Sequence, residues 1–249
     1  MLSSAVLNVP GNKGACTIVT ETLVDSEDPA FANPTKPVGA MYTKEEADEK
    51  AASLGWALAP DGDMFRRVVP SPQPQSILQI EQIKALLSAQ EGLVICCGGG
   101  GVPMVRSSDG MLEGVEAVID KDMVSALLAK QLDADGLIIL TDGGGIFENF
   151  GKENAREMAR ATPEHLTDTW LPTNFEKFAG SMGPKVTACV KFVEEQPEGK
   201  GIWAAIGDLK DAEEIVAGTE GTVVTKDMNL PVEWRDKGSQ SSNLSDKFN

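Results

Sequence analysis

Cysteine and histidine are scarce in this chain of 249 residues. It has four cysteines and one histidine, His165, with neither a C-x-x-C pair nor a His-Cys cluster. This composition excludes a disulfide scaffold and argues against a structural zinc site. Cys96 and Cys97 lie in the apolar run Leu93–Cys97, which we interpret as a buried strand with its two thiols on opposite faces. One histidine in a polar setting also makes a Ser-His-Asp hydrolase improbable.

Positive charge and long apolar runs are lacking as well. The chain has 22 Lys and Arg against 38 Asp and Glu, for a net charge of -16. Because binding to a nucleic-acid backbone needs clustered cations, we expect no nucleic-acid partner, although small anions can bind where a few cations are placed locally. No apolar run is long enough to span a membrane, and Met1–Gly11 does not have the pattern of a signal peptide. We therefore expect no membrane partner. We also expect a cytoplasmic protein, although a targeting segment could precede Met1.

Helical and strand patterns alternate along most of the chain. This alternation, with glycine-rich turns between the elements, is typical of a parallel α/β sheet with right-handed crossovers. The predicted helices are Ser76–Gln90, Lys121–Leu132 and Pro184–Glu195, and the predicted strands are Ala15–Val24, Leu93–Cys97, Gly136–Leu140 and Thr222–Val224.

A proline-rich stretch interrupts this order between Asp25 and Pro74. Thr43 and Glu46 form a capping-box pattern that opens a short helix, Lys44–Leu54, and Arg66–Val69 has a strand-like composition. We interpret residues 26–74 as a small lid subdomain that protrudes from a main domain over residues 12–226. Residues 227–249 are polar and serine-rich, and we expect a disordered tail there.

Two glycine-rich segments follow predicted strands, where open parallel sheets bind their ligands. Gly98–Gly101 follows one strand, and Gly143–Gly145 follows Thr141 and Asp142 at the end of the next. Glycine lets backbone N–H groups approach phosphate oxygens closely, although each run could equally be a plain flexible turn. Neither run matches the Walker A pattern, which excludes a P-loop enzyme.

Two lysines begin predicted helices. Lys121 lies between Asp120 and Asp122, and Lys185 follows Pro184. A cation in the first helical turn opposes the helix dipole, so this placement is favourable if an anion also binds there, held by the amine and the backbone N–H groups. Asp120 and Asp122 would then hold the Lys121 amine in position. A solvated lysine beside an aspartate cap is the alternative, but two such sites beside two glycine turns favour phosphoryl transfer, which needs cations and alignment more than a nucleophile.

At these residues the chain resembles the carbamate kinases of the amino acid kinase superfamily. The similar segments run in order along the chain, and their combination is specific to carbamate kinases, above all Asn33–Gly39 in the lid. They are Thr22–Gly39 (TLVDSEDPAFANPTKPVG), Arg67–Pro74 (RVVPSPQP), Gly98–Val105 (GGGGVPMV), Gly114–Asp122 (GVEAVIDKD), Leu140–Asp142 and Gly180–Lys185 (GSMGPK).

The resemblance implies a fold and a reaction. The fold is a three-layer α/β/α sandwich with a mainly parallel central sheet, the amino acid kinase fold, together with the protruding lid. The reaction is reversible phosphoryl transfer between carbamoyl phosphate plus ADP and carbamate plus ATP, which serves arginine catabolism. Mg²⁺ comes with the nucleotide, no cofactor or protein-held metal is tightly bound, and the partner is a second copy of the chain in a homodimer.

The resemblance also implies roles for individual residues. Lys121 and Lys185 would be the cations on the transferred phosphoryl group, Asp122 would orient them, and Lys36 would reach in from the lid. Gly98, Gly99, Gly100 and Gly101 would form a loop for the substrate phosphate. Thr141, Asp142, Met182 and Lys185 would lie on the nucleotide side.

The chain departs from the family pattern at several places. The family's opening strand with a Gly-Gly-Asn loop, and its later Gly-Asn-Gly-Pro-Gln loop, are not present. Gly143–Gly145 replaces a bulkier stretch, and Trp203–Leu209 replaces a turn containing Thr and Ser. The first hypothesis is a carbamate kinase sequence that lacks its N-terminal strands, so that any organellar targeting segment would precede Met1. The alternatives are an inactive nucleotide-binding paralogue that acts as a partner or regulatory subunit, and a related kinase acting on a carboxylate or on UMP.

Overall fold

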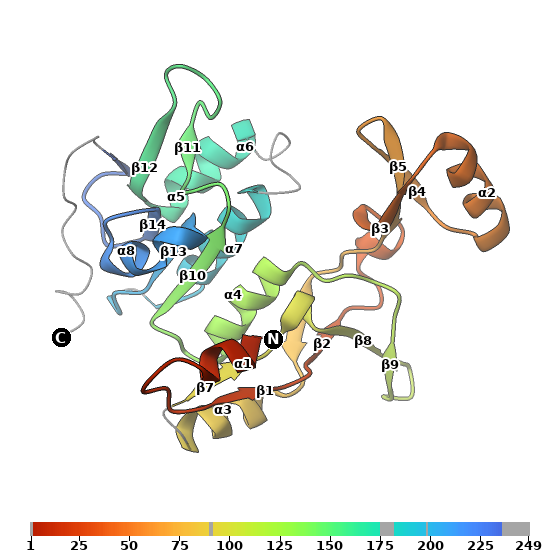
Figure 1. Ribbon diagram of the computed structural model, residues 1–249, viewed down its shortest axis with the longest axis horizontal. Helices are drawn as coiled ribbons and strands as arrows, with labels where there is room; N and C mark the ends of the chain where they lie inside the picture. Colours follow the sequence, from red (N-terminus) through yellow and green to blue (C-terminus); the bar gives the residue numbers. More distant parts are fainter. Residues whose placement is uncertain (1, 90–91, 175–181, 198, 236–249) are drawn as a thin grey trace. The chain divides into compact units, whose positions relative to one another are not determined.

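The chain forms two compact units, residues 1–124 and 125–249, where the sequence predicts one kinase domain with a lid. The computed structural model describes residues 2–89, 92–174, 182–197 and 199–235. Figure 1 shows the course of the chain, and each unit is described by itself below. The boundary between the units falls inside one helix, α4 (Lys121–Gln131).

The first unit contains three separate sheets. β1 pairs with β7 in parallel, β6-β2-β8-β9 form a four-stranded mixed sheet, and β3-β5-β4 form an antiparallel sheet. The elements are α1 (Leu2–Leu7), β1 (Ala15–Thr17), β2 (Glu21–Val24), η1 (Pro29–Phe31), β3 (Lys36–Tyr42), α2 (Lys44–Leu54), β4 (Leu58–Asp61), β5 (Met64–Val69), β6 (Pro74–Ile77), α3 (Ile80–Ala89), β7 (Leu93–Ile95), η2 (Gly98–Gly100), β8 (Val102–Arg106) and β9 (Leu112–Gly114).

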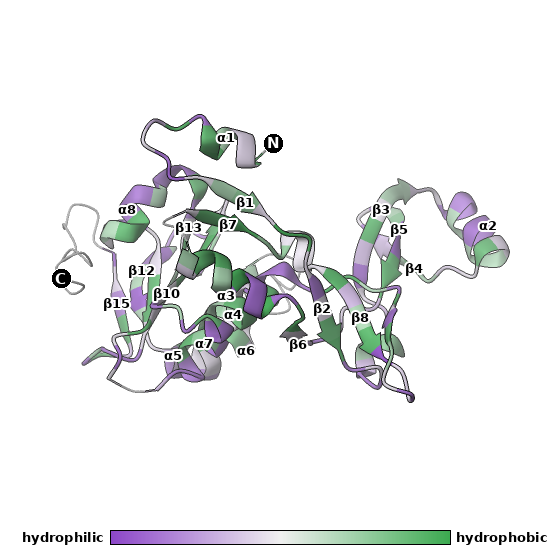
Figure 2. Cartoon of the chain, turned by 90° about the horizontal axis from the view of Figure 1, so that it is seen from below, coloured by the Kyte–Doolittle hydropathy of each residue, from purple (hydrophilic) through white to green (hydrophobic). Residues whose placement is uncertain are grey.

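The antiparallel sheet β3-β5-β4 and the helix α2 lie within the stretch predicted as a lid. The helix has the bounds that the capping-box pattern predicts, and Thr43 and Glu46 exchange both hydrogen bonds of the box. Gly55 ends the helix in the left-handed conformation. Only Ala47 of this helix is buried, which agrees with the mostly hydrophilic colouring of α2 in Figure 2.

The second unit is built on one mixed sheet of order β10-β13-β14-β12-β11, and β15 also pairs with β12. β10 and β13 run parallel, as do β12 and β14, whereas the neighbouring β13 and β14 run antiparallel. The elements are β10 (Gly136–Thr141), β11 (Phe147–Glu148), β12 (Arg156–Ala161), α5 (Pro163–His165), η3 (Leu166–Trp170), α6 (Leu171–Asn174), α7 (Met182–Glu194), β13 (Trp203–Asp208), η5 (Leu209–Asp211), α8 (Ala212–Ala217), β14 (Thr222–Thr225) and β15 (Val232–Trp234).

The core of the second unit lies between α7 and this sheet. Val186, Val190 and Val193, which the helical spacing places on one face, are all buried. Every residue of β14 is buried, as is expected of a strand with neighbours on both sides. The predicted elements α4, β10, α7 and β14 are therefore confirmed to within a few residues.

The strand predicted over residues 15–24 is two strands, β1 and β2, in different sheets. The break lies at Thr20, which is 3% exposed. Its hydroxyl oxygen accepts the N–H of Cys97 at 2.6 Å, and its carbonyl oxygen accepts the N–H of Val102 at 2.8 Å. Thr20 therefore binds the chain on both sides of the glycine loop instead of continuing one ladder.

Other differences concern sheet direction and element ends. The sequence predicts a mainly parallel sheet, but the sheet of the second unit is mixed. Its pairs β10–β13 and β12–β14 are parallel, whereas β11–β12, β12–β15 and β13–β14 are antiparallel. Antiparallel pairs also occur in the first unit. The helix predicted from residue 76 begins at Ile80, because Pro74–Ile77 pairs with β2 as a strand. β15 pairs with β12 inside the segment predicted as a disordered tail, and residues 236–249 lie outside the described part.

Candidate functional site

The glycine loop, Gly98–Gly101, follows β7 in the first unit. Cys97 opens it in the left-handed conformation, with φ 56° and ψ 25°. Gly100 donates its N–H to the carbonyl oxygen of Cys97 at 3.0 Å, and Gly101 donates to Gly98 at 3.2 Å. The four glycines thus form a tight turn that leads directly into β8.

Two of these glycines are required by close packing. Gly100 has φ +98°, and a Cβ on it would overlap the carbonyl oxygen of Ile119. A Cβ on Gly101 would lie 2.5 Å from the hydroxyl oxygen of Thr22, whose own O–H is within 3.0 Å of the Gly100 carbonyl. Gly98 and Gly99 are exposed, with open space where a side chain would stand. The buried half of the loop is therefore anchored to β2 and to the segment before α4, while the other half faces solvent.

The N-terminus of α4 follows Ile119 and carries three of the predicted charged residues. Asp120 caps the helix, because its Oδ1 accepts the N–H groups of Asp122 at 2.9 Å and Met123 at 3.3 Å. Its Oδ2 accepts from the Nζ of Lys36, which lies at the start of β3, at 2.7 Å. The structure thus brings together Lys36, the start of α4 and the glycine loop, which the sequence separates by up to 84 positions.

Lys121 and Asp122 differ sharply in exposure. The side chain of Lys121 is 64% exposed, whereas that of Asp122 is 9% exposed. The Lys121 Nζ lies 3.9 Å from the Asp122 Oδ2, an ion pair beyond hydrogen-bond length. Lys121 therefore places a largely exposed side chain beside the first turn of α4, where the helix dipole favours an anion.

The contact with Lys36 helps to lower the pKa of Asp120. Burial raises the pKa of Asp120, but the hydrogen bond and charge of Lys36, together with the amides of Asp122 and Met123, outweigh burial and hold this pKa below its usual value. The ionised carboxylate is therefore the form that suits the folded state. The sequence predicts that Lys36 acts from the lid, and the structure identifies Asp120 as a partner of its amine.

Replacing Asp120 with asparagine tests this contact. Because the folded-state pKa is lowered, the stabilisation is fully present above the unfolded value of about 3.9 and is lost as the pH falls through the folded-state pKa. We expect Asp120→Asn to lower the free energy of unfolding by about 1 to 2 kcal/mol at pH 7, since asparagine still caps a helix but cannot pair with Lys36. The free energies of unfolding of the two proteins, measured by urea titration, should converge as the pH falls below about 4. A constant difference across that range would contradict the assignment.

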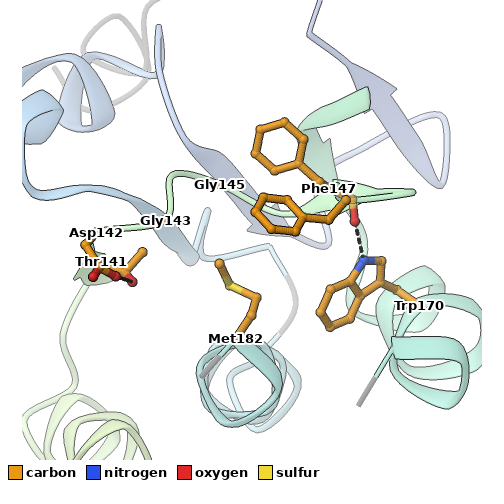
Figure 3. Close-up of a pocket in the computed structure, with 8 residues that line it drawn as sticks. Thr141, Asp142, Gly143, Gly145, Phe147, Trp170 and Met182 are labelled. Carbon is orange, nitrogen blue, oxygen red and sulfur yellow. Dashed lines mark hydrogen bonds between the residues drawn. The ribbon is translucent and has the colours of Figure 1, made fainter. Parts of the chain in front are cut away.

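A pocket of about 210 Å³ lies in the second unit at the end of β10. Its walls include three residues predicted on the nucleotide side, and the rest are mainly aromatic or glycine. The lining residues are Thr141, Asp142, Gly143, Gly145, Phe147, Phe150, Trp170 and Met182. Figure 3 shows the Met182 side chain rising from α7 between the polar pair Thr141 and Asp142 and the aromatic rings. Composition patterns do not point to the aromatic wall, because its residues come from β11, a loop and η3.

The aromatic wall is held by internal contacts. Trp170 donates its indole N–H to the carbonyl oxygen of Phe147 at 2.8 Å (Figure 3). The rings of Phe147 and Phe150 meet edge to face with their centroids 5.6 Å apart, a favourable arrangement. The pocket therefore has one polar end and one apolar end, which suits a flat ring carrying a polar substituent.

Glu157 and Thr222 accept hydrogen bonds from the turn that borders the pocket. Gly145 donates its N–H to the Oε1 of Glu157 at 3.2 Å, and Ile146 donates to the hydroxyl oxygen of Thr222 at 2.7 Å. A Cβ on Gly145 would lie 2.5 Å from that Glu157 oxygen, so only glycine fits. Burial raises the pKa of Glu157, although the nearby charge of Arg235 opposes the shift.

Lys185 lies in the first turn of α7, three residues after Met182, and is half-buried. It does not line the pocket, so its predicted role on the nucleotide side stays a prediction. Positions 180 and 181 of the motif Gly180–Lys185 lie outside the described residues.

The described part of the chain contains neither a candidate metal centre nor a candidate membrane-spanning helix. No group of three or more His, Cys, Asp or Glu side chains in that part of the chain could hold a metal ion. Likewise, none of the helices described there is both long and apolar enough to cross a membrane.

A sequence model of the amino acid kinase family matches residues 36–200. The chain is 46% identical over 218 residues to the carbamate kinase of Haemophilus influenzae, covering 88% of this chain and 67% of that protein. It is 44% identical over 226 residues to the carbamate kinase of Escherichia coli strain K12, covering 90% of this chain and 71% of that protein. The chain thus spans about two thirds of the length of these relatives.

Solved structures of carbamate kinase are also similar to this chain, in both sequence and fold. The carbamate kinase of Giardia lamblia bound to AMP-PNP has a TM-score of 0.71 at 40% identity, covering 90% of this chain and 68% of that one. The same protein bound to citric acid has a TM-score of 0.74 at 40% identity, with the same coverage. The α/β fold of this chain matches theirs.

Proposed function

Because the chain belongs to the amino acid kinase family and, within it, to the carbamate kinases, we propose that it transfers a phosphoryl group reversibly between carbamoyl phosphate plus ADP and carbamate plus ATP. The observation that carries this proposal is the similarity to several carbamate kinases at 42–46% identity over about nine tenths of the chain. The alternative of a related kinase acting on UMP or on another carboxylate has no comparable support.

In the first unit, we assign phosphoryl stabilisation to three groups. Lys121 supplies an exposed cation at the start of α4, and the loop Gly98–Gly101 supplies backbone N–H groups on its open side. Lys36 adds a second cation from β3, and Asp122 orients Lys121. Transfer of a phosphoryl group requires such preorganised charge more than covalent chemistry, so these residues match the demand.

In the second unit, we assign the pocket at the end of β10 to the nucleotide. Thr141, Asp142 and Met182 form one side of it, and the aromatic wall offers an apolar surface for a base. Lys185, in the first turn of the same helix as Met182, is a third cation, assigned to the transferred group. Mg²⁺ would arrive on the nucleotide phosphates.

The remaining parts of the proposal concern architecture and setting. We place the fold among three-layer α/β/α sandwiches, with residues 26–74 acting as a lid and residues 12–226 as the kinase domain. The working form is a homodimer in the cytoplasm, with arginine catabolism as the setting and no resident cofactor.

A second candidate is a chain that binds nucleotide without turnover, as a partner or regulatory subunit. The pocket favours it, because its lining residues all belong to the second unit and need no residue of the first. Nucleotide binding and phosphoryl transfer could therefore be separated.

A coupled assay distinguishes the two candidates. The chain is given carbamoyl phosphate, ADP and Mg²⁺, and ATP formation is followed with hexokinase and glucose-6-phosphate dehydrogenase, while ADP binding is measured by calorimetry. We expect ATP formation above a no-enzyme control. In the reverse direction, with ATP as donor, we expect ADP formation with carbamate and none when UMP replaces carbamate. ADP binding without ATP formation would support the second candidate, and the absence of both would contradict both.

A further inference from the structure

Cys96 and Cys97 stand directly before the glycine loop, and the proposed phosphoryl transfer uses neither thiol. Successive residues of a strand point to opposite faces, which is the arrangement that the sequence predicts for this pair. That prediction is wrong, because β7 ends at Ile95 and Cys97 adopts the left-handed conformation. The two neighbouring thiols instead lie between the end of β7 and the glycine loop, outside any strand.

The two thiols have different surroundings. Cys97 is 6% exposed, and its N–H is fixed by the hydroxyl oxygen of Thr20 at 2.6 Å. The hydrogen bond with Cys96 lowers the pKa of Cys97 to about 7, against the effect of burial and with a further contribution from Thr20. The same hydrogen bond, together with burial, raises the pKa of Cys96, which is half-buried. Cys97 is therefore the more readily ionised thiol of the pair, and Cys96 the one that keeps its proton.

We propose that Cys96 and Cys97 are a redox modification site, in which a peroxide converts the adjacent thiols into a reversible disulfide that disables the glycine loop. The sulfur of Cys97 attacks one peroxide oxygen, the O–O bond breaks, and a sulfenic acid and one water or alcohol form. The sulfur of Cys96 then attacks the Cys97 sulfur, the S–O bond breaks, and water leaves with the Cys96 proton. The two sulfurs together lose two electrons, which reduce the peroxide.

The adjacency of the two residues makes this disulfide labile. Neighbouring Cα atoms are about 3.8 Å apart across a trans peptide, less than the 4.4 to 6.8 Å (about 5.5 Å most often) of ordinary disulfides. The resulting strain makes the bond easy to reduce, as is typical of regulatory rather than structural disulfides. The two adjacent thiols can therefore be oxidised to a disulfide and readily reduced again.

Closing such a ring would change the backbone of Cys97, and the loop has little room to adapt. Gly100 lies so close to the Ile119 carbonyl oxygen, and Gly101 to Thr22, that neither position has room for even a methyl group. The carbonyl oxygen of Cys97 is also bound by the Gly100 N–H. The effect on catalysis rests on the proposed role of Gly98–Gly101, whereas disulfide formation itself does not.

Cys16 and Cys189 provide internal comparisons. Cys16 is half-buried in β1 and Cys189 is fully buried in α7, and neither has a cysteine beside it in the chain. Their thiols do not have the adjacent partner on which the proposed ring closure depends.

The test is peptide mass spectrometry of the full chain after hydrogen peroxide. Free thiols are blocked with N-ethylmaleimide before trypsin digestion, which places Cys96 and Cys97 together on the peptide of residues 85–106. We expect this peptide to be unlabelled and lighter by two hydrogens, and to accept two labels if dithiothreitol precedes blocking. In parallel, ATP formation should fall about a hundredfold on oxidation, the effect of misplacing reacting groups by about an ångström, and recover with dithiothreitol.

Single variants complete the test. Cys96→Ser should stay active in reductant and form no disulfide in this peptide, while Cys16→Ser should oxidise as the unaltered chain does. A labelled peptide, a sulfinic or sulfonic acid at Cys97, or a disulfide joining Cys96 to Cys16 would overturn the proposal. A disulfide that leaves ATP formation unchanged would overturn its effect on the loop. If the reduced chain makes no ATP, the peptide masses still decide on the disulfide, so failure of the proposed function is recognised separately.

Discussion

Replacing Gly100 with alanine is expected to cost about 3 kcal/mol of folding free energy. The backbone at Gly100 has φ +98°, which is strained for any other residue by about 1 to 3 kcal/mol. The added methyl group would also overlap the carbonyl oxygen of Ile119, and forcing extra atoms into a packed site adds about 1 to 3 kcal/mol. Thermal unfolding should show a midpoint lower by about 6 to 12 °C.

Gly98→Ala is the matched control for this prediction. It makes the same chemical change two residues earlier in the same loop, at a position with open space around the new methyl group and no positive φ. We expect its unfolding free energy to stay within about 0.5 kcal/mol of the unaltered chain. Equal losses in the two variants would show that the loop is not anchored through Gly100.

Replacing Lys121 with alanine is expected to lower kcat for ATP formation by about a hundredfold to a thousandfold. The proposed role of this lysine is to neutralise charge that develops on the transferred phosphoryl group, and removing one such preorganised group typically has an effect of about that size. Because its side chain is 64% exposed, the fold should tolerate the change. The KM for ADP should change little if the interaction is made mainly in the transition state.

Lys84→Ala is the control for Lys121. Lys84 is also a helical lysine with a nearby carboxylate, Glu81, but its side chain is 43% exposed and it lies in α3. Steady-state kinetics of the two variants should separate a local role from a general effect of lost positive charge on this acidic protein. A kcat for Lys121→Ala that equals that of Lys84→Ala would remove Lys121 from the mechanism.

Local patterns predicted several elements because the determinants lie close together in the sequence. The capping box of Thr43 and Glu46 fixes the start of α2 without help from the rest of the fold. The valine spacing in α7 reports directly which side of the helix is buried. Thr141, Asp142 and Met182, identified by resemblance, do line one pocket.

The features that could not be predicted depend on packing between distant segments. β13 lies inside the sheet of the second unit, but its sequence WAAIGD contains small residues of low strand propensity. These small residues suit the site, because a Cβ on Gly207 would overlap the side chain of Ile215. The pairing of Lys36 with Asp120 joins residues 84 positions apart, so no local pattern could reveal it.

The boundary between the two units has a practical consequence for dissecting the protein. It falls between Val124 and Ser125, inside α4, where Met123, Val124 and Ala126 are buried. A cut there would break the hydrogen-bond ladder of a helix and expose apolar side chains in both fragments. Separate expression of either half is therefore a poor way to study ligand binding. Point variants in the intact chain are the better test.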